Sequence, residues 1–234
     1  MPDTVHRTEN DDIVDRDAWT SRRIELLEAE KDLIRRHDEL VAARRALPWV
    51  RVSADHRFDT DEGERSLLDL FGDHTQLVVY HFMFGDDWDE GCPSCSFWAD
   101  NFDGIDVHLA ARDVSFVVSS TAPLDRLLEY RQRMGWSFRW VSSGGGTFNR
   151  DFGVTGSDSY NYRPVEEPIG ESPGLSVFVR RGDEVFHTYS TYARGLEVFN
   201  GAYQLLDLVP KGRDEDELPW TMAWLRRHDQ YEAG

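Results

Sequence analysis

The sequence predicts an α/β fold in which helices flank a mixed central sheet, with a helical extension at the N-terminus. Two apolar runs, 77–84 and 113–119, are rich in β-branched and aromatic residues and have the length of buried strands. Apolar residues at helical spacing follow each of these runs. Further along, 175–180 and 185–189 flank a Gly-containing turn, which predicts a hairpin. Strands that alternate with helices and end in a hairpin are typical of a mixed sheet.

The composition indicates one folded domain with extensions. The chain has 234 residues, of which 40% are hydrophobic, and its eight Trp and thirteen Phe can build a substantial core. The formal net charge of -18 argues against a nucleic-acid partner and against anionic membrane surfaces, because both are bound by clustered Lys and Arg. The N-terminus lacks the layout of a signal peptide, and no apolar run has the length of a membrane span. We therefore expect a cytoplasmic protein with no membrane partner.

The N-terminal part is predicted to be an arm followed by one long helix. Residues 1–16 are polar and acidic, which predicts a flexible arm. Over 17–47 an apolar residue returns every seven positions among charged ones. The residues of this repeat are Trp19, Leu26, Leu33, Leu40 and Leu47. Apolar side chains stand directly beside several of them, which favours a helix packed on its own domain, and the repeat also permits a homodimer contact.

Residues 48–210 are predicted to form the main domain. The residue before Pro48 avoids the helical region, so the long helix ends there. Besides the two apolar runs and the hairpin, the expected elements are a strand at 49–52, a short helix at 66–72, a helix from Pro123 to Gly135, an extended segment at 138–141 and a helix at 196–206.

Two segments have less regular patterns. Residues 142–173 are rich in Gly, Ser, Asn and Pro, and they fit either a functional lid or an ordinary surface connection. Residues 211–234 are polar apart from the apolar side chains of 220–225. We expect them to form a C-terminal extension that docks through a short helix.

The strongest functional signal is a pair of cysteines spaced as Cys-x-x-Cys. Cys92 and Cys95 are the only cysteines, and they stand at the predicted start of the helix that follows 77–84. Backbone N–H groups at a helix start stabilise a thiolate, and a partner one turn later can close a disulfide. The pair could instead pack as small apolar residues or supply half of a zinc site. No second Cys-x-x-Cys or closely spaced His pair accompanies it, so the pattern favours redox chemistry with no metal and no cofactor.

Several phrases of the sequence resemble known proteins. The segment 172–183 looks like the thioredoxin segment in which a cis-proline opens a strand before a Gly-containing hairpin. More narrowly, 19–213 resembles a bacterial family known as a domain of unknown function, family eight-nine-nine, which is classed as thioredoxin-like. The phrases that carry this resemblance are 80–85, 92–95, 133–136 and 187–195. The resemblance implies a thioredoxin-like fold for 48–210.

The resemblance also implies roles for four residues. Cys92 matches the attacking cysteine of thioredoxin and Cys95 the resolving one, and we expect Cys92 to be the more exposed and more acidic thiol. Pro173 matches the cis-proline that lies against the disulfide, so the bond between Ser172 and Pro173 is expected to be cis. His81 stands where thioredoxins have a buried carboxylate that assists the second cysteine. We expect it to be buried behind the cysteines, and a hydrogen-bonded core histidine is the alternative.

These features predict a thiol–disulfide oxidoreductase whose substrate is a disulfide or thiol of a protein or small molecule. A thiol peroxidase and a non-enzymatic binding module on the same fold are the alternatives. Peroxiredoxins carry a threonine three residues before their attacking cysteine and a proline further upstream, and these groups favour the peroxide transition state. This chain has Asp89 and Gly85 at those positions. Because an ionised aspartate has no proton to donate, the sequence favours disulfide exchange.

Overall fold

The computed structural model describes residues 13–231. The chain divides into two compact units. The first runs to Pro48 and includes Leu206–Asp214, and the second comprises Trp49–Leu205 and the chain from Glu215 on. Across 13–231 no helix combines the length and the apolar character needed to cross a membrane.

The first unit contains the long helix α1 (Arg16–Arg45). It begins after Asp15, whose carboxylate accepts a hydrogen bond of 2.8 Å from the Ala18 N–H and so caps the helix. Every residue of α1 is at least partly exposed, including Trp19, Leu26, Leu33 and Leu40 of the apolar repeat. The homodimer contact through this helix stays a prediction. Most of the predicted arm, residues 1–12, lies outside the described residues, and Arg16 already belongs to α1.

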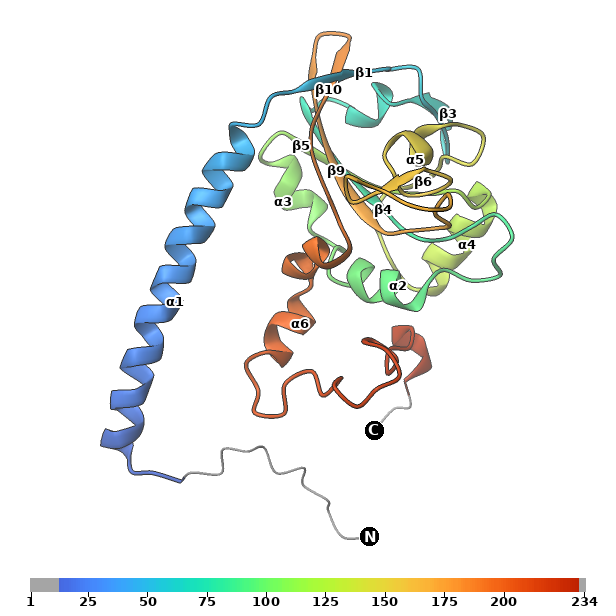
Figure 1. Cartoon of the computed structure of the whole chain (residues 1–234). Helices are drawn as coiled ribbons and strands as arrows, with labels where there is room; N and C mark the ends of the chain where they lie inside the picture. Colours follow the sequence, from blue (N-terminus) through green and yellow to red (C-terminus); the bar gives the residue numbers. More distant parts are fainter. Residues whose placement is uncertain (1–12, 232–234) are drawn as a thin grey trace. The chain divides into compact units, whose positions relative to one another are not determined.

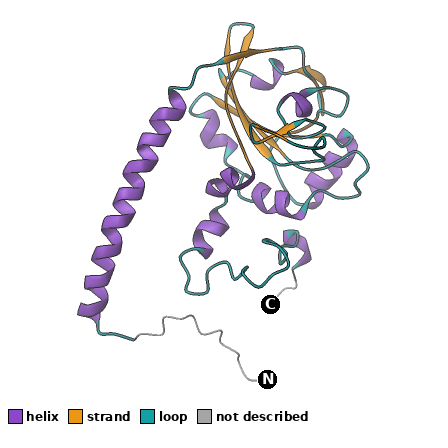
Figure 2. Ribbon diagram, viewed as in Figure 1, coloured by secondary structure: helices purple, strands orange, loops and turns teal. Residues whose placement is uncertain are grey.

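The second unit is built around an eight-stranded sheet (Figure 2). Its strands are β1 (Val50–Val52), β2 (Arg57–Thr60), β3 (Gly63–Ser66), β4 (Gln76–His81), β5 (Val114–Ser120), β6 (Trp140–Ser142), β9 (Gly174–Arg181) and β10 (Glu184–Tyr192). Their order across the sheet is β1-β10-β9-β4-β5-β6-β2-β3. The α-helices of this part of the chain include α2 (Pro93–Ala99), α3 (Asp106–Ala110), α4 (Leu124–Arg133), α5 (Phe148–Asp151) and α6 (Gly201–Leu206). Its 3-10 helices include η1 (Asp69–Phe71), η2 (Ala193–Phe199) and η3 (His228–Gln230).

The centre of the sheet has the connectivity of the thioredoxin fold (Figure 1). β4 and β5 are parallel, while β9 runs antiparallel to both β4 and β10. A helix follows β4, another follows β5, and the β9–β10 hairpin leads into η2 and α6. The thioredoxin-like mixed sheet predicted from the sequence is therefore confirmed. β6 and the β2–β3 hairpin extend it beyond the four central strands.

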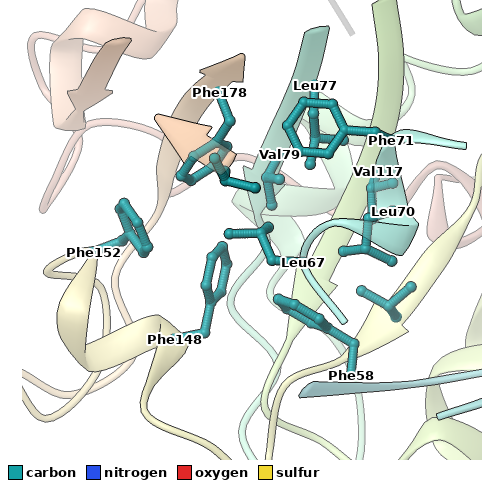
Figure 3. Packing of buried hydrophobic residues seen from close by; sticks show 12 residues of the cluster. Phe58, Leu67, Leu70, Phe71, Leu77, Val79, Val117, Phe148, Phe152 and Phe178 are labelled. Atoms are coloured by element: carbon teal, nitrogen blue, oxygen red, sulfur yellow. The ribbon is translucent and has the colours of Figure 1, made fainter. Parts of the chain in front are cut away.

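The two faces of β4 belong to different layers. Leu77 and Val79 join a core cluster that also contains Phe148 of α5 and Phe178 of β9 (Figure 3). Tyr80 projects from the opposite face, because successive side chains of a strand alternate, and its ring contacts Phe102 beyond α2 at a centroid distance of 4.9 Å. Burying a large apolar side chain contributes about 1.5–3 kcal/mol, so both layers stabilise the sheet. The consequence for function is that α2 covers only the Tyr80 face.

The segment 142–173 is more regular than its composition suggested. It contains α5 and a two-stranded hairpin of β7 (Ser159–Tyr160) and β8 (Arg163–Pro164). Both turn residues of that hairpin, Asn161 and Tyr162, have positive φ angles of 49° and 63°. A left-handed pair of this kind is the geometry of a tight hairpin turn. The segment is thus an ordered connection that leads back into β9.

Candidate active site

The two cysteines lie at the start of α2, beyond the end of β4. Cys92 is the N-cap residue and is partly exposed, whereas Cys95 is only 2% exposed, and both are free thiols. Pro93 occupies the first turn, where a missing N–H is no loss. The Cys92 N–H donates to the Met83 carbonyl at 3.1 Å, and the Met83 N–H donates to the Cys95 sulfur at 3.4 Å. These two bonds hold the thiol pair against Met83, in the loop that follows β4.

The environment shifts the two thiol pKa values in opposite directions. The Cys95 thiol, hydrogen-bonded to the Cys92 sulfur, is the main reason why the pKa of Cys92 falls to about 6. Burial opposes this shift, and the backbone N–H groups of Cys95 and Ser94 add to it. Burial raises the pKa of Cys95 well above its usual value, and Cys92 raises it further. At neutral pH Cys92 is therefore largely thiolate and Cys95 is a thiol.

His81 is buried, but it does not lie behind the cysteines. It shares its face of β4 with Val79, while α2 covers the opposite face. Its ring stacks on Phe148 with a centroid distance of 5.5 Å, and its Nε2 bonds the Ser176 hydroxyl at 2.8 Å. The predicted position of His81 was wrong because adjacent residues of a strand face opposite sides of the sheet, so an error of one residue in register places a side chain on the wrong face. Its surroundings are those of a core histidine.

Tyr80 occupies the buried position behind the cysteines that was predicted for His81. Its side chain is fully buried on the α2 face, and its hydroxyl makes no hydrogen bond of ordinary geometry in the dithiol form. Burial raises the pKa of Tyr80 well above its usual value, and the charge of Cys95 raises it further, so the phenol stays protonated. The same phenol, within reach of the Cys95 sulfur, lowers the pKa of that thiol. In the sequence, a tyrosine within a buried strand resembles an ordinary core residue. Only the register of β4 could have shown that Tyr80 faces the cysteines.

Pro173 lies at the end of the sheet from which the loop between β4 and Cys92 leaves, since the next residue, Gly174, pairs with His81, the last residue of β4. No peptide bond in the described chain is cis, so the predicted cis bond between Ser172 and Pro173 was wrong. The trans form is intrinsically favoured by about 0.5–1 kcal/mol before proline. Two hydrogen bonds also hold the chain just before β9: the Ser172 N–H donates to the Val154 carbonyl at 2.8 Å, and the Tyr160 hydroxyl donates to the Pro173 carbonyl at 3.1 Å.

A cavity of about 560 Å³ opens elsewhere in the same unit. Side chains of His56, Asp151, Phe152, Tyr162 and His187 contribute to its lining, and neither cysteine does. Within 13–231, no three His, Cys, Asp or Glu side chains are arranged to hold a metal ion. The chemistry of the thiols is thus located outside this cavity.

The fold and the two thiols together define a thioredoxin-fold protein with a Cys-x-x-Cys pair. The chain belongs to a bacterial protein family of unknown function, DUF899, whose family model matches residues 8–231. A comparison with curated proteins finds no match.

Three solved structures illustrate what the fold is similar to. Peroxidoxin BcpB from Mycobacterium tuberculosis is 17% identical, covers 62% of this chain and 85% of its own, and has a TM-score of 0.47. A Cys-to-Ser mutant of peroxiredoxin Q from Xanthomonas campestris is 14% identical, with coverages of 69% and 97% and a TM-score of 0.49. A secreted disulfide oxidoreductase of Mycobacterium tuberculosis is 17% identical, with coverages of 62% and 91% and a TM-score of 0.37. Since every identity is below 25% and every TM-score below 0.5, these likenesses support no statement about the activity of this chain.

Proposed function

We propose that the protein is a thiol–disulfide oxidoreductase. The Cys92 thiolate attacks one sulfur of a substrate disulfide, and the other substrate sulfur leaves as a thiolate that takes up a proton. Cys95 then loses its proton and attacks the Cys92 sulfur, which releases the second substrate thiol. The substrate disulfide is reduced to two thiols while the protein dithiol becomes a disulfide. An external dithiol returns the protein to its starting state.

The observation that carries this proposal is the opposite character of two thiols in contact. Cys92 is partly exposed with a pKa lowered to about 6, so it can both reach a substrate and attack it as a thiolate. Cys95 is buried with a raised pKa, so substrate cannot reach it, yet it is held beside the Cys92 sulfur. Such proximity favours rapid intramolecular resolution. Two cysteines that only packed in a core would need neither the exposure nor the acidity of Cys92.

Disulfide exchange and peroxide reduction can be compared directly. We expect the protein, supplied with a dithiol donor, to reduce insulin disulfides and to consume hydrogen peroxide below ordinary enzymic efficiency, which begins near roughly 10⁴ M⁻¹s⁻¹. The reason is that Asp89, three residues before Cys92, is a carboxylate and offers no proton to a leaving oxygen. Efficient peroxide turnover without reduction of insulin would instead identify a thiol peroxidase. Thiols that stay alkylatable after mild oxidation would identify a binding module.

Tyr80 provides a second test, because its phenol is within hydrogen-bond reach of the resolving thiol, whereas it interacts with Cys92 through charge alone. Its phenol can donate a hydrogen bond to the Cys95 thiolate as that thiol loses its proton. Tyr80→Phe should therefore slow resolution about tenfold, equivalent to about one pKa unit, and leave the first attack unchanged. Dithiobis(nitrobenzoate) reports both steps in one stopped-flow trace, since attack by Cys92 releases the first nitrothiophenolate and resolution by Cys95 the second.

The matched control for this substitution is Tyr192→Phe. Tyr192 is also buried, but its hydroxyl donates to the Phe152 carbonyl at 2.8 Å. Both phases should keep their wild-type rates in that variant. A Tyr80→Phe protein in which the two phases slow equally, or not at all, would leave the phenol with a packing role.

A further inference from the structure

We infer that Arg227 is a positioning residue for the attacking thiol, and that the C-terminal segment 215–231 completes the site. The inference rests on the proposed function of Cys92. It concerns a segment that lies more than a hundred residues beyond the cysteines and for which the sequence predicts only a docked C-terminal extension.

The Arg227 guanidinium holds the residue immediately before the nucleophile. Its Nε and Nη2 both donate to the Gly91 carbonyl, at 3.1 and 2.7 Å. On the other side Gly91 rests on aromatic rings, because a Cβ there would lie 2.7 Å from Phe82 and 2.9 Å from Tyr130. Gly91 is thus held between these two aromatic rings on one side and the Arg227 guanidinium on the other. This contact fixes the backbone direction at the residue before Cys92.

A chain of hydrogen bonds continues from the same guanidinium to Cys92 itself. Nε of Arg227 donates to the Tyr130 hydroxyl at 2.9 Å, which lies 2.9 Å from the Ser96 hydroxyl. That hydroxyl in turn donates to the Cys92 carbonyl at 2.9 Å. Arg227 therefore supports the carbonyl groups immediately before and after the Cα atom of Cys92. The Arg227 side chain is only 12% exposed, so water competes weakly for these bonds.

Arg227 also compensates the charge nearest to the thiolate in sequence. Its Nη1 lies 2.7 Å from one Glu90 oxygen, and Arg133 lies 2.5 Å from the other. Without Arg227 the Glu90 carboxylate would be less neutralised, two residues from Cys92, and a nearby negative charge raises a thiol pKa. Cys95 and Tyr80 also interact with Cys92. Loss of the Arg227 contact with Gly91 and loss of charge compensation at Glu90 should therefore both raise the pKa of Cys92.

The segment that carries Arg227 is anchored independently of it. Leu225 is 4% exposed, His228 Nδ1 lies 2.7 Å from an Asp100 oxygen, and Asp229 pairs with Arg133 at 2.7 Å. Substitution of Arg227 alone should therefore leave the segment in place. Arg226, the neighbouring residue, is an internal control because its guanidinium donates only to carbonyl groups of Ala223 and Leu225 in its own segment.

The test compares Arg227→Gln, Arg227→Lys and Arg226→Gln in the full chain. The rate at which iodoacetamide alkylates Cys92 is followed against pH by mass spectrometry, and circular dichroism checks the fold. We expect Arg227→Gln to move the midpoint up by about one pH unit and to slow alkylation at pH 6 about fivefold or more. Arg227→Lys keeps the charge but cannot donate to Gly91 through two nitrogens, so its midpoint should lie between those of the wild type and Arg227→Gln. Arg226→Gln should have the wild-type midpoint.

Two outcomes would overturn the inference. One is a wild-type pH profile in Arg227→Gln, or in Arg227→Lys if the glutamine variant fails to fold. The other is a wild-type profile in Arg227→Lys beside a shifted profile in Arg227→Gln, because the effect would then be charge alone and not the contact with Gly91. The proposed function is judged separately by insulin reduction: a shifted Cys92 titration in a protein without exchange activity would retain the positioning role and reject the oxidoreductase.

Discussion

Cys92→Ser is expected to abolish disulfide reduction, with a loss on the order of a thousandfold or more, because a serine hydroxyl is not ionised at neutral pH. Cys95→Ser should behave differently. Its Cys92 thiol still attacks, so the first nitrothiophenolate from dithiobis(nitrobenzoate) is released, while the mixed disulfide accumulates because no second thiol resolves it. Mass spectrometry of the quenched protein would show one added nitrothiophenolate group on Cys92.

The pH dependence of the first attack tests the same assignment. A thiol attacks as its thiolate, so the wild-type rate should rise as pH passes through about 6, the pKa of Cys92, and level off above it. In Cys95→Ala the midpoint should move upward, since the hydrogen bond from the Cys95 thiol is the main cause of the lowered pKa and alanine has no donor. Faster alkylation of Cys95 than of Cys92 at neutral pH would reverse the assignment of the two roles.

The sequence predicted the central sheet because its strands carry unambiguous patterns. The run at 77–84 and the hairpin of β9 and β10 are long, apolar and bounded by turn residues, and β4, β9 and β10 lie there. The β2–β3 hairpin was missed because only Phe58 and Thr60 of its eight strand residues are buried, and its charged residues resemble a loop. Local patterns find strands that enter a core and overlook those that only extend its edge.

The candidate site shows a similar division. The position of Cys92 and Cys95 at a helix start follows from adjacent residues, whereas the partners of the thiols come from distant ones. Tyr80 and His81 are neighbours in sequence, and only the register of β4 determines which of them faces α2. Arg227 reaches Gly91 across 136 residues. No pattern within one segment could predict these contacts, because each depends on how the chain packs.

His81 is expected to make the protein less stable toward acid. It is 1% exposed, lies against Phe148 and Phe152, and bonds Ser176, whose hydroxyl continues to Ser190 at 2.8 Å. Burial lowers the pKa of His81 from 6.5 to about 3, and the charge of a neighbouring histidine adds to the shift. The folded state therefore keeps His81 neutral at a pH where the unfolded chain already binds a proton.

The sign follows from this difference in bound protons. Between pH 6.5 and 3 the unfolded state carries the extra proton, so the free energy of unfolding falls as pH falls, by up to about 1.4 kcal/mol per unit from this residue. From pH 7.5 to 4.5 the loss due to His81 should amount to about 2–3 kcal/mol. Urea unfolding at the two pH values measures it. His81→Asn should be less stable at pH 7.5, because it loses ring contacts, but should lose less on acidification.

His187→Asn is the matched control for this experiment. The pKa of His187 is also lowered by burial, but His187 is only half-buried and lines the open cavity. Its substitution should reduce the loss on acidification less than the substitution of His81 does. If His81→Asn and the wild type lose the same free energy of unfolding between pH 7.5 and 4.5, His81 is not the residue that acid protonates on unfolding. The ring would then have to be charged in the folded core, against the desolvation imposed by Phe148 and Phe152.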